Sequence, residues 1–155
     1  MTAQFVSQRI PPLALTVIMI LLMSLIAWQM PQFSFMLPHN TLVALCVAFI
    51  GAVISVAGVV SFRTADTTVN PNKPHQASTL VVRGIYRYSR NPMYLGFMYF
   101  LLAWGVFLAH LLSLLFPLGF VVYMNRFQIP LEEEALEEKF GEEFILYKNR
   151  VRRWL

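Results

Sequence analysis

Arginine and tyrosine side chains gather between Gly84 and Gly96, where a basic segment gives way to an uncharged apolar run. Guanidinium groups bind anions through paired hydrogen bonds, and tyrosine hydroxyls donate or accept one. Asn91 and Pro92 are typical of a helix start, with the Asn side chain capping free backbone N–H groups. The stretch predicts a site for a polar ligand at the edge of an apolar region. Anchoring of a helix at a membrane interface is the alternative, because aromatic and basic residues also gather there.

Two glutamates further along the chain, Glu132 and Glu133, are the candidate carboxylates. Glu132 stands one helical turn before Leu136, so its carboxylate is aimed along an apolar stripe, and Glu133 flanks that stripe. A buried carboxylate is costly unless a cation or hydrogen-bond donors compensate it. We expect the arginines of the 63–91 loop, or a cationic ligand, to do so. The stripe repeats at helical intervals over 131–153 and consists of Leu136, Phe140, Phe144, Tyr147 and Val151, whereas Glu134, Glu138 and Glu142 fall on a solvated face. Two shorter helices, interrupted at Gly141, are the alternative.

The elements that position these groups are predicted from the distribution of charge. Of the 155 residues, 57% are hydrophobic and only 13% are charged, whereas about a quarter are charged in an ordinary soluble domain. No Asp, Glu, Lys or Arg occurs between Arg9 and Arg63, or between Arg90 and Arg126. The composition therefore predicts an all-α integral membrane protein with a single domain over 1–155.

The uncharged stretches are long enough for four transmembrane helices, since one helical span needs roughly 20 apolar residues. The last two are expected to form a tight hairpin that turns near His110, and one long tilted helix is the alternative. The 63–91 loop carries five basic residues against one acidic, so the positive-inside rule places it in the cytoplasm. Both termini and the amphipathic helix at 131–153 are expected on the same side. The predicted spans are about 11–30, 41–62, 92–109 and 111–125.

Metal binding and nucleic-acid binding find little support in the sequence. The histidines His39, His75 and His110 are scattered, and Cys46 is isolated; a metal site needs such ligands in a cluster. The isoelectric point of about 9.5 is common among membrane proteins. We expect neither a metal nor a nucleic acid as a partner.

Two motifs in order resemble those of the isoprenylcysteine carboxyl methyltransferase and phospholipid methyltransferase superfamily. The first is Gly-x-Tyr-Arg-x-x-Arg-x-Pro-x-Tyr-x-Gly, from Gly84 to Gly96, and the second is Glu-Glu-x-x-Leu-x-x-x-Phe-Gly, from Glu132 to Gly141. The resemblance extends from about Phe62 to Trp154, and the first two spans match only in hydropathy. Members of this superfamily are small membrane enzymes that use S-adenosylmethionine and release S-adenosylhomocysteine.

The resemblance implies a cofactor pocket at the cytoplasmic ends of the last two spans, covered by the C-terminal helix. Arg90, Asn91 and Glu132 are then the expected catalytic residues, acting by positioning rather than by acid–base chemistry. Asn91 stands where the family most often has histidine, and an amide cannot exchange a proton near neutral pH. For Gly96, close packing of a neighbouring helix is an alternative to contact with a ligand. The expected cofactor-binding residues are Tyr86, Arg90, Asn91, Pro92, Tyr94, Gly96, Glu132 and Glu133.

The methyl acceptor stays open at this level. Family members methylate prenylated cysteine carboxyls, phospholipid amines or thiols, so membrane lipid and a lipophilic or small acceptor are the expected partners. A non-catalytic membrane scaffold with the same fold is one alternative, suggested by Asn91. A small four-helix transporter subunit is another, but such carriers place a carboxylate within a span and none of the predicted spans contains one.

Overall fold

The computed structural model describes residues 10–64 and 79–155, and these residues form a helical protein. The only β pairing among them is an isolated bridge between Ser34 and His110, so the predicted all-α class is confirmed. Residues 65–78 of the predicted 63–91 loop, including His75, lie outside the described residues. The principal helices are α1 (Pro12–Gln29), α2 (Asn40–Arg63), α3 (Pro92–Leu108), α4 (Phe116–Tyr123), α5 (Ile129–Phe140) and α6 (Glu142–Arg150), with short helical turns η2 (Pro31–Phe33), η4 (Gly84–Arg87), η5 (Ser113–Leu115) and η6 (Met124–Gln128).

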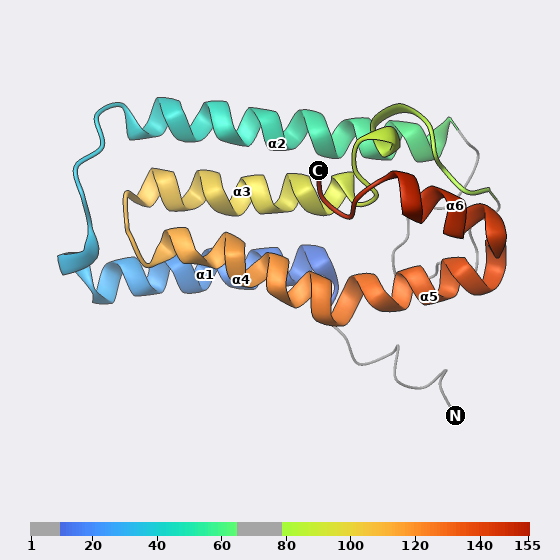
Figure 1. The fold of residues 1–155 in the computed structure, drawn as a ribbon. Coiled ribbons are helices and arrows are strands. Elements are labelled where there is room, and N and C mark those ends of the chain that lie inside the picture. The colour runs from blue at the N-terminus through green and yellow to red at the C-terminus, as the bar shows by residue number, and fades with distance from the viewer. Residues whose placement is uncertain (1–9, 65–78) are drawn as a thin grey trace.

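Helix α3 lies at the centre of the bundle, between α2 on one side and α1 and α4 on the other (Figure 1). Two glycines let the backbones of α2 and α3 approach closely. A Cβ atom at Gly96 would lie 2.7 Å from the Gly51 carbonyl oxygen and would collide with Ser55 Oγ, and one at Gly51 would lie 2.9 Å from the Gly96 carbonyl oxygen. Small residues at helix contacts are typical of membrane proteins. Packing against α2 therefore explains the glycine at position 96.

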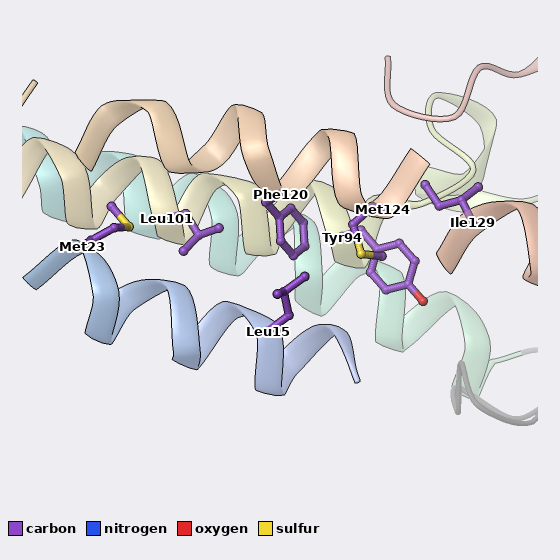
Figure 2. Close-up of a cluster of buried hydrophobic side chains, with 7 residues drawn as sticks. All are labelled: Leu15, Met23, Tyr94, Leu101, Phe120, Met124 and Ile129. Carbon is purple, nitrogen blue, oxygen red and sulfur yellow. The ribbon is translucent and has the colours of Figure 1, made fainter. Parts of the chain in front are cut away.

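A cluster of buried side chains joins α1, α3 and the α4–α5 helix (Figure 2). Met23, Leu101, Phe120 and Met124 in this cluster are completely buried. Many large apolar residues point outward instead; Phe49 on α2, for example, is 70% exposed. A soluble monomer rarely exposes so much apolar surface, so the helices fit a lipid environment.

Three helical stretches are long and apolar enough to cross a membrane: 12–29, 40–63 and 113–140. The fourth candidate, α3, has 17 residues and is slightly shorter. The expected hairpin is present, because α3 ends at Ala109 in a left-handed conformation with φ of 45° and α4 returns beside it. At the turn, the buried His110 ring is 3.0 Å from the Met30 carbonyl oxygen, which ties the turn to the end of α1.

The predicted bounds of the C-terminal helix are wrong at both ends. The helix that begins in the α3–α4 turn continues through the π-helical turn η6 into α5 and ends at Phe140, instead of breaking between 125 and 131. Pro130 has no backbone N–H to donate to the preceding turn, and the π-helical turn η6 lies directly before it, where the hydrogen-bond pattern already departs from that of an α-helix. Gly141 then adopts φ 53° and ψ −123°, a conformation open essentially to glycine alone, and the chain reverses into α6. The alternative of two shorter helices that meet at Gly141 is therefore confirmed.

Candidate functional site

The predicted site residues meet at one end of the bundle, where α3 begins. Turn η4 precedes α3 here, α5 leaves the bundle at this end, and α6 folds back toward the start of α3 (Figure 1). The apolar stripe of the predicted tail helix faces inward, since Phe144 and Tyr147 are buried, while Glu134, Glu138 and Glu142 are exposed as expected. This arrangement brings Glu132 and Glu133 to the first turns of α3.

Glu132 points toward α3, as the apolar stripe predicts, but the groups that bind its buried carboxylate are neutral side chains and not cations. Its Oε1 atom accepts a hydrogen bond from the Tyr94 hydroxyl at 2.6 Å and another from Gln128 Nε2 at 2.7 Å. The Tyr94 side chain is 4% exposed, and its ring lies at the edge of the buried cluster with the hydroxyl directed away from it (Figure 2). No hydrogen bond to Oε2 is found within the described residues. One carboxylate oxygen is therefore held in place and the other is left as an acceptor.

Glu133 is the carboxylate that the arginines neutralise. Its Oε1 atom lies 2.8 Å from a terminal nitrogen of Arg90 and 2.9 Å from Arg153 Nε, and its Oε2 atom lies 2.7 Å from Arg153 NH2. The side chains of Arg90 and Glu133 are only 10% and 11% exposed, whereas that of Arg153 is 34% exposed. Hydrogen bonding to Glu133 raises the pKa of Arg153, while burial lowers the pKa of Arg90 against the opposing effect of Glu133. The expectation that arginines compensate Glu132 is therefore wrong, and they bind its neighbour.

Asn91 does not cap α3 with its side chain, contrary to expectation. Its amide nitrogen donates to the Arg153 carbonyl oxygen at 3.1 Å, and Ser89 Oγ donates to the same oxygen at 3.2 Å. Ser89 Oγ also accepts a hydrogen bond from the Asn91 backbone N–H at 3.1 Å. The amide of Asn91 is thus used by a segment that lies 62 residues away in the sequence, which no local helix signal could indicate.

Tyr86 is buried in the wall of the site. Its ring packs edge-on against Phe62 of α2 with centroids 5.2 Å apart, and its carbonyl oxygen accepts a hydrogen bond of 2.7 Å from the Tyr147 hydroxyl. Burial raises the pKa of both phenols. Pro92 is also fully buried and lies near Gly58 of α2. These residues fix the position of η4 relative to α2 and α6.

Sequence reasoning missed three side chains of the site: Ser89, Gln128 and Arg153. Gln128 could have been found, because it precedes Glu132 by one helical turn on the same face. Ser89 and Arg153 give no comparable signal, since their partners become neighbours only after Gly141 reverses the chain.

The comparison with known proteins extends over most of this arrangement. Residues 39–143 match the family model described as "Phospholipid methyltransferase". The chain belongs to the phospholipid methyltransferase family. This confirms the resemblance predicted from the two motifs, and the matched range includes Tyr94, Gln128 and both glutamates. The residues that follow α5, including Arg153, lie almost entirely beyond it.

Proteins similar to this chain include one of Haemophilus influenzae named only as uncharacterized, which is 48% identical over 63 residues, 41% of this chain and all of its own length. Protein-S-isoprenylcysteine O-methyltransferase of Saccharomyces cerevisiae is 37% identical over 82 residues, 51% of this chain and 33% of that protein. The B enzyme of the same name from Arabidopsis thaliana is 26% identical over 110 residues, 69% of this chain and 54% of that protein. The chain thus covers between a third and just over half of these two enzymes. No solved structure matches it.

The polar atoms of the site fit a methyl donor of the S-adenosylmethionine type. Such a donor carries ribose hydroxyls, an ammonium group and a carboxylate. Glu132 Oε2, which accepts no hydrogen bond from the residues that the structure describes, can accept from a hydroxyl or an ammonium group. Arg90 Nε is buried and has no hydrogen-bond partner among residues 10–64 and 79–155, and a guanidinium N–H of this kind can donate to a carboxylate. Acceptors and donors of both required kinds are therefore present beside α3.

Proposed function

We propose that this protein is an S-adenosylmethionine-dependent methyltransferase that acts at the membrane on a lipophilic or small acceptor. Membership of the family supports methyltransferase chemistry. The observation that carries the proposal for this chain is the Glu132 carboxylate, which has one oxygen fixed by Tyr94 and Gln128 and the other available to a ligand. A partly buried acceptor with a fixed orientation costs stability unless something binds to it.

Each residue of the site has a part that its contacts suggest. Glu132 would hold the donor through hydroxyl or ammonium hydrogens, and Tyr94 keeps that carboxylate in one rotamer. Arg90 would hold an anionic group, and Glu133 fixes Arg90. The donor supplies a methyl group activated by a positively charged sulfur. The protein would then need to align the donor with the acceptor and to exclude water, and neither task requires a residue that transfers a proton.

Asn91 has a positioning role in this proposal. Its side chain is an amide and its donor nitrogen is already bonded to the Arg153 carbonyl oxygen. An acceptor that is anionic before transfer, such as a carboxylate or a thiolate, needs no base at this position. An amine acceptor must first lose a proton. The names of the relatives from Saccharomyces and Arabidopsis favour a carboxylate attached to a lipid group.

We also propose that α1, α2, α3 and α4 are four spans, with the site and both termini on the cytoplasmic side. The exposed arginines support this orientation, because Arg63, Arg83, Arg87 and Arg126 all lie near the end of the bundle where α3 begins. The donor would then approach from the aqueous side and the lipophilic acceptor from the bilayer.

Calorimetric titration of the purified protein in detergent with S-adenosylhomocysteine tests the first half of the proposal. Folding is verified in the same sample by thermal unfolding. Transfer of a labelled methyl group to prenylated cysteine analogues, membrane lipid extracts and small thiols then identifies the acceptor class. A folded protein that does not bind would refute the enzyme proposal, and binding without transfer to any of these classes would favour the non-catalytic scaffold.

A further inference from the structure

Residues 151–155, which we name the strap, lie against the start of α3 after α6 ends. The Arg90 backbone N–H donates to the Arg152 carbonyl oxygen at 3.0 Å, and the Arg153 carbonyl oxygen accepts from both Asn91 and Ser89. Trp154 Nε1 donates to Asn125 Oδ1 on η6 at 3.0 Å. In Figure 1 the chain leaves α6 and turns back toward the first turns of α3. The strap therefore bridges the two elements that carry the site.

The Arg153 side chain adds a charged contact between the strap and the site. It forms a two-point ion pair with Glu133, the same carboxylate that binds Arg90. Both oxygens of Glu133 are thus engaged while the strap is in place. Arg153 and Glu133 come from opposite sides of the reversal at Gly141, so this pair joins the strap directly to α5.

The strap is held mainly by polar contacts, and its Trp154 side chain packs against the edge of the buried cluster. None of its five residues is buried, and Arg152 and Leu155 are exposed. Segments with few buried apolar contacts open locally at a small fraction of the free energy of global unfolding. Seven polar contacts hold the strap. One of them, from the Val151 N–H to the Tyr147 carbonyl oxygen, continues α6, and the partners of the other six lie on the η4–α3 junction, η6 or α5. Local opening would break these six contacts and release Trp154 from the edge of the buried cluster, while the helices of the bundle keep their contacts with one another.

We propose that the strap is a latch over the donor site, and that Arg153 is the positioning residue that closes it by pairing with Glu133. This inference rests on the proposed function, because the site it covers is the one assigned to the methyl donor. The donor enters and leaves when the strap is open. Closure restores the contacts of Arg90 and Asn91 and excludes water from the site.

The first experiment uses no cofactor, so its result does not depend on the proposed function. Hydrogen–deuterium exchange is measured for the Arg90 amide, which is bonded to the strap, and for the Leu95 amide, which is bonded within α3. We expect Arg153→Gln to accelerate exchange at Arg90 roughly tenfold and to leave Leu95 unchanged. Arg152→Gln is the matched control, because only the backbone of Arg152 contacts the site, and it should behave as the wild type. Unchanged exchange at Arg90 in Arg153→Gln, or equal acceleration at both amides, would overturn the latch.

The second experiment measures the kinetics of S-adenosylhomocysteine binding by stopped flow. A latch limits both entry and exit, so Arg153→Gln should raise the association and dissociation rate constants together, by roughly five- to tenfold. If only the dissociation rate constant rises, and the association rate constant stays unchanged, then Arg153 contacts the ligand and the latch is contradicted. Asn125→Ala removes the Trp154 contact and leaves the ion pair intact; it should produce the same pattern with a smaller amplitude, and it serves if Arg153→Gln does not fold. Absence of binding to the wild-type protein refutes the proposed function, whereas the exchange experiment still decides whether the strap opens.

Discussion

Replacement of Glu132 by Gln separates the ligand-binding role proposed for this residue from its role in the fold. The Gln side chain has nearly the same shape, and its carbonyl oxygen can still accept from Tyr94 and Gln128, which both donate to Oε1 of the glutamate. The second position changes from an acceptor oxygen to an NH2 donor. The fold should therefore keep its contacts, while a ligand hydroxyl or ammonium group loses its acceptor.

The magnitudes follow from the two sides of the carboxylate. A hydrogen bond to a charged group contributes about 1.5–3 kcal/mol, against about 0.5–1.5 kcal/mol for a neutral one. On the protein side, two bonds become weaker, but the cost of holding a charge in a partly buried site disappears, so the change in stability should stay below about 1 kcal/mol. On the ligand side, one charge-assisted bond is lost, which weakens binding by roughly 10- to 100-fold.

The assay is calorimetric titration with S-adenosylhomocysteine in detergent, paired with thermal unfolding of the same preparation. Glu138→Gln is the matched control, because Glu138 is exposed on the opposite face of α5. It should change neither quantity. Equal losses of affinity in Glu132→Gln and Glu138→Gln would refute the assignment of faces, and unchanged affinity in Glu132→Gln would refute the role of Oε2 as a ligand acceptor.

Two further predictions concern the contacts that position the site. Gly96→Ala should lower the thermal midpoint by several degrees, since its Cβ would lie 2.7 Å from the Gly51 carbonyl oxygen. Gly119→Ala is the control, because a Cβ there meets nothing within 4 Å; it should leave the thermal midpoint unchanged or raise it. Tyr147→Phe leaves the buried Tyr86 carbonyl oxygen without its 2.7 Å donor, so the free energy of unfolding, measured by chemical denaturation, should fall by about 1–2 kcal/mol. Tyr88→Phe changes an exposed tyrosine and should alter that free energy by less than about 0.5 kcal/mol. Equal effects of the two substitutions would contradict the contact.

The direction of Glu132 could be predicted from sequence because one helical repeat relates it to Leu136 and the apolar stripe. The helical hairpin could be predicted because a single span between Arg90 and Arg126 would leave the basic loop and the C-terminal segment, which also carries several basic residues, on opposite sides of a membrane. These inferences use only the period of a helix and the distribution of charge.

The partners of the two glutamates could not be predicted in the same way. Neighbours in the sequence differ by about 100° around a helix, so Glu132 faces the tyrosine of α3 while Glu133 faces the arginines of the loop and the strap. Which partner each one meets depends on how α5 is rotated against α3 and on the reversal at Gly141. Both are properties of tertiary packing, which the hydrophobic pattern of the sequence does not predict.

The π-helical turn η6, at Met124–Gln128, sets that rotation. A π turn accommodates one residue more than an α-helical turn, so it offsets the angular phase of everything after it by about 100°. The helix over 113–140 therefore has two independent phases, one set by the apolar part before η6 and the other by the part that faces α3. Removing a single residue from this turn would rotate everything after it by about 100° and turn both carboxylates away from their partners.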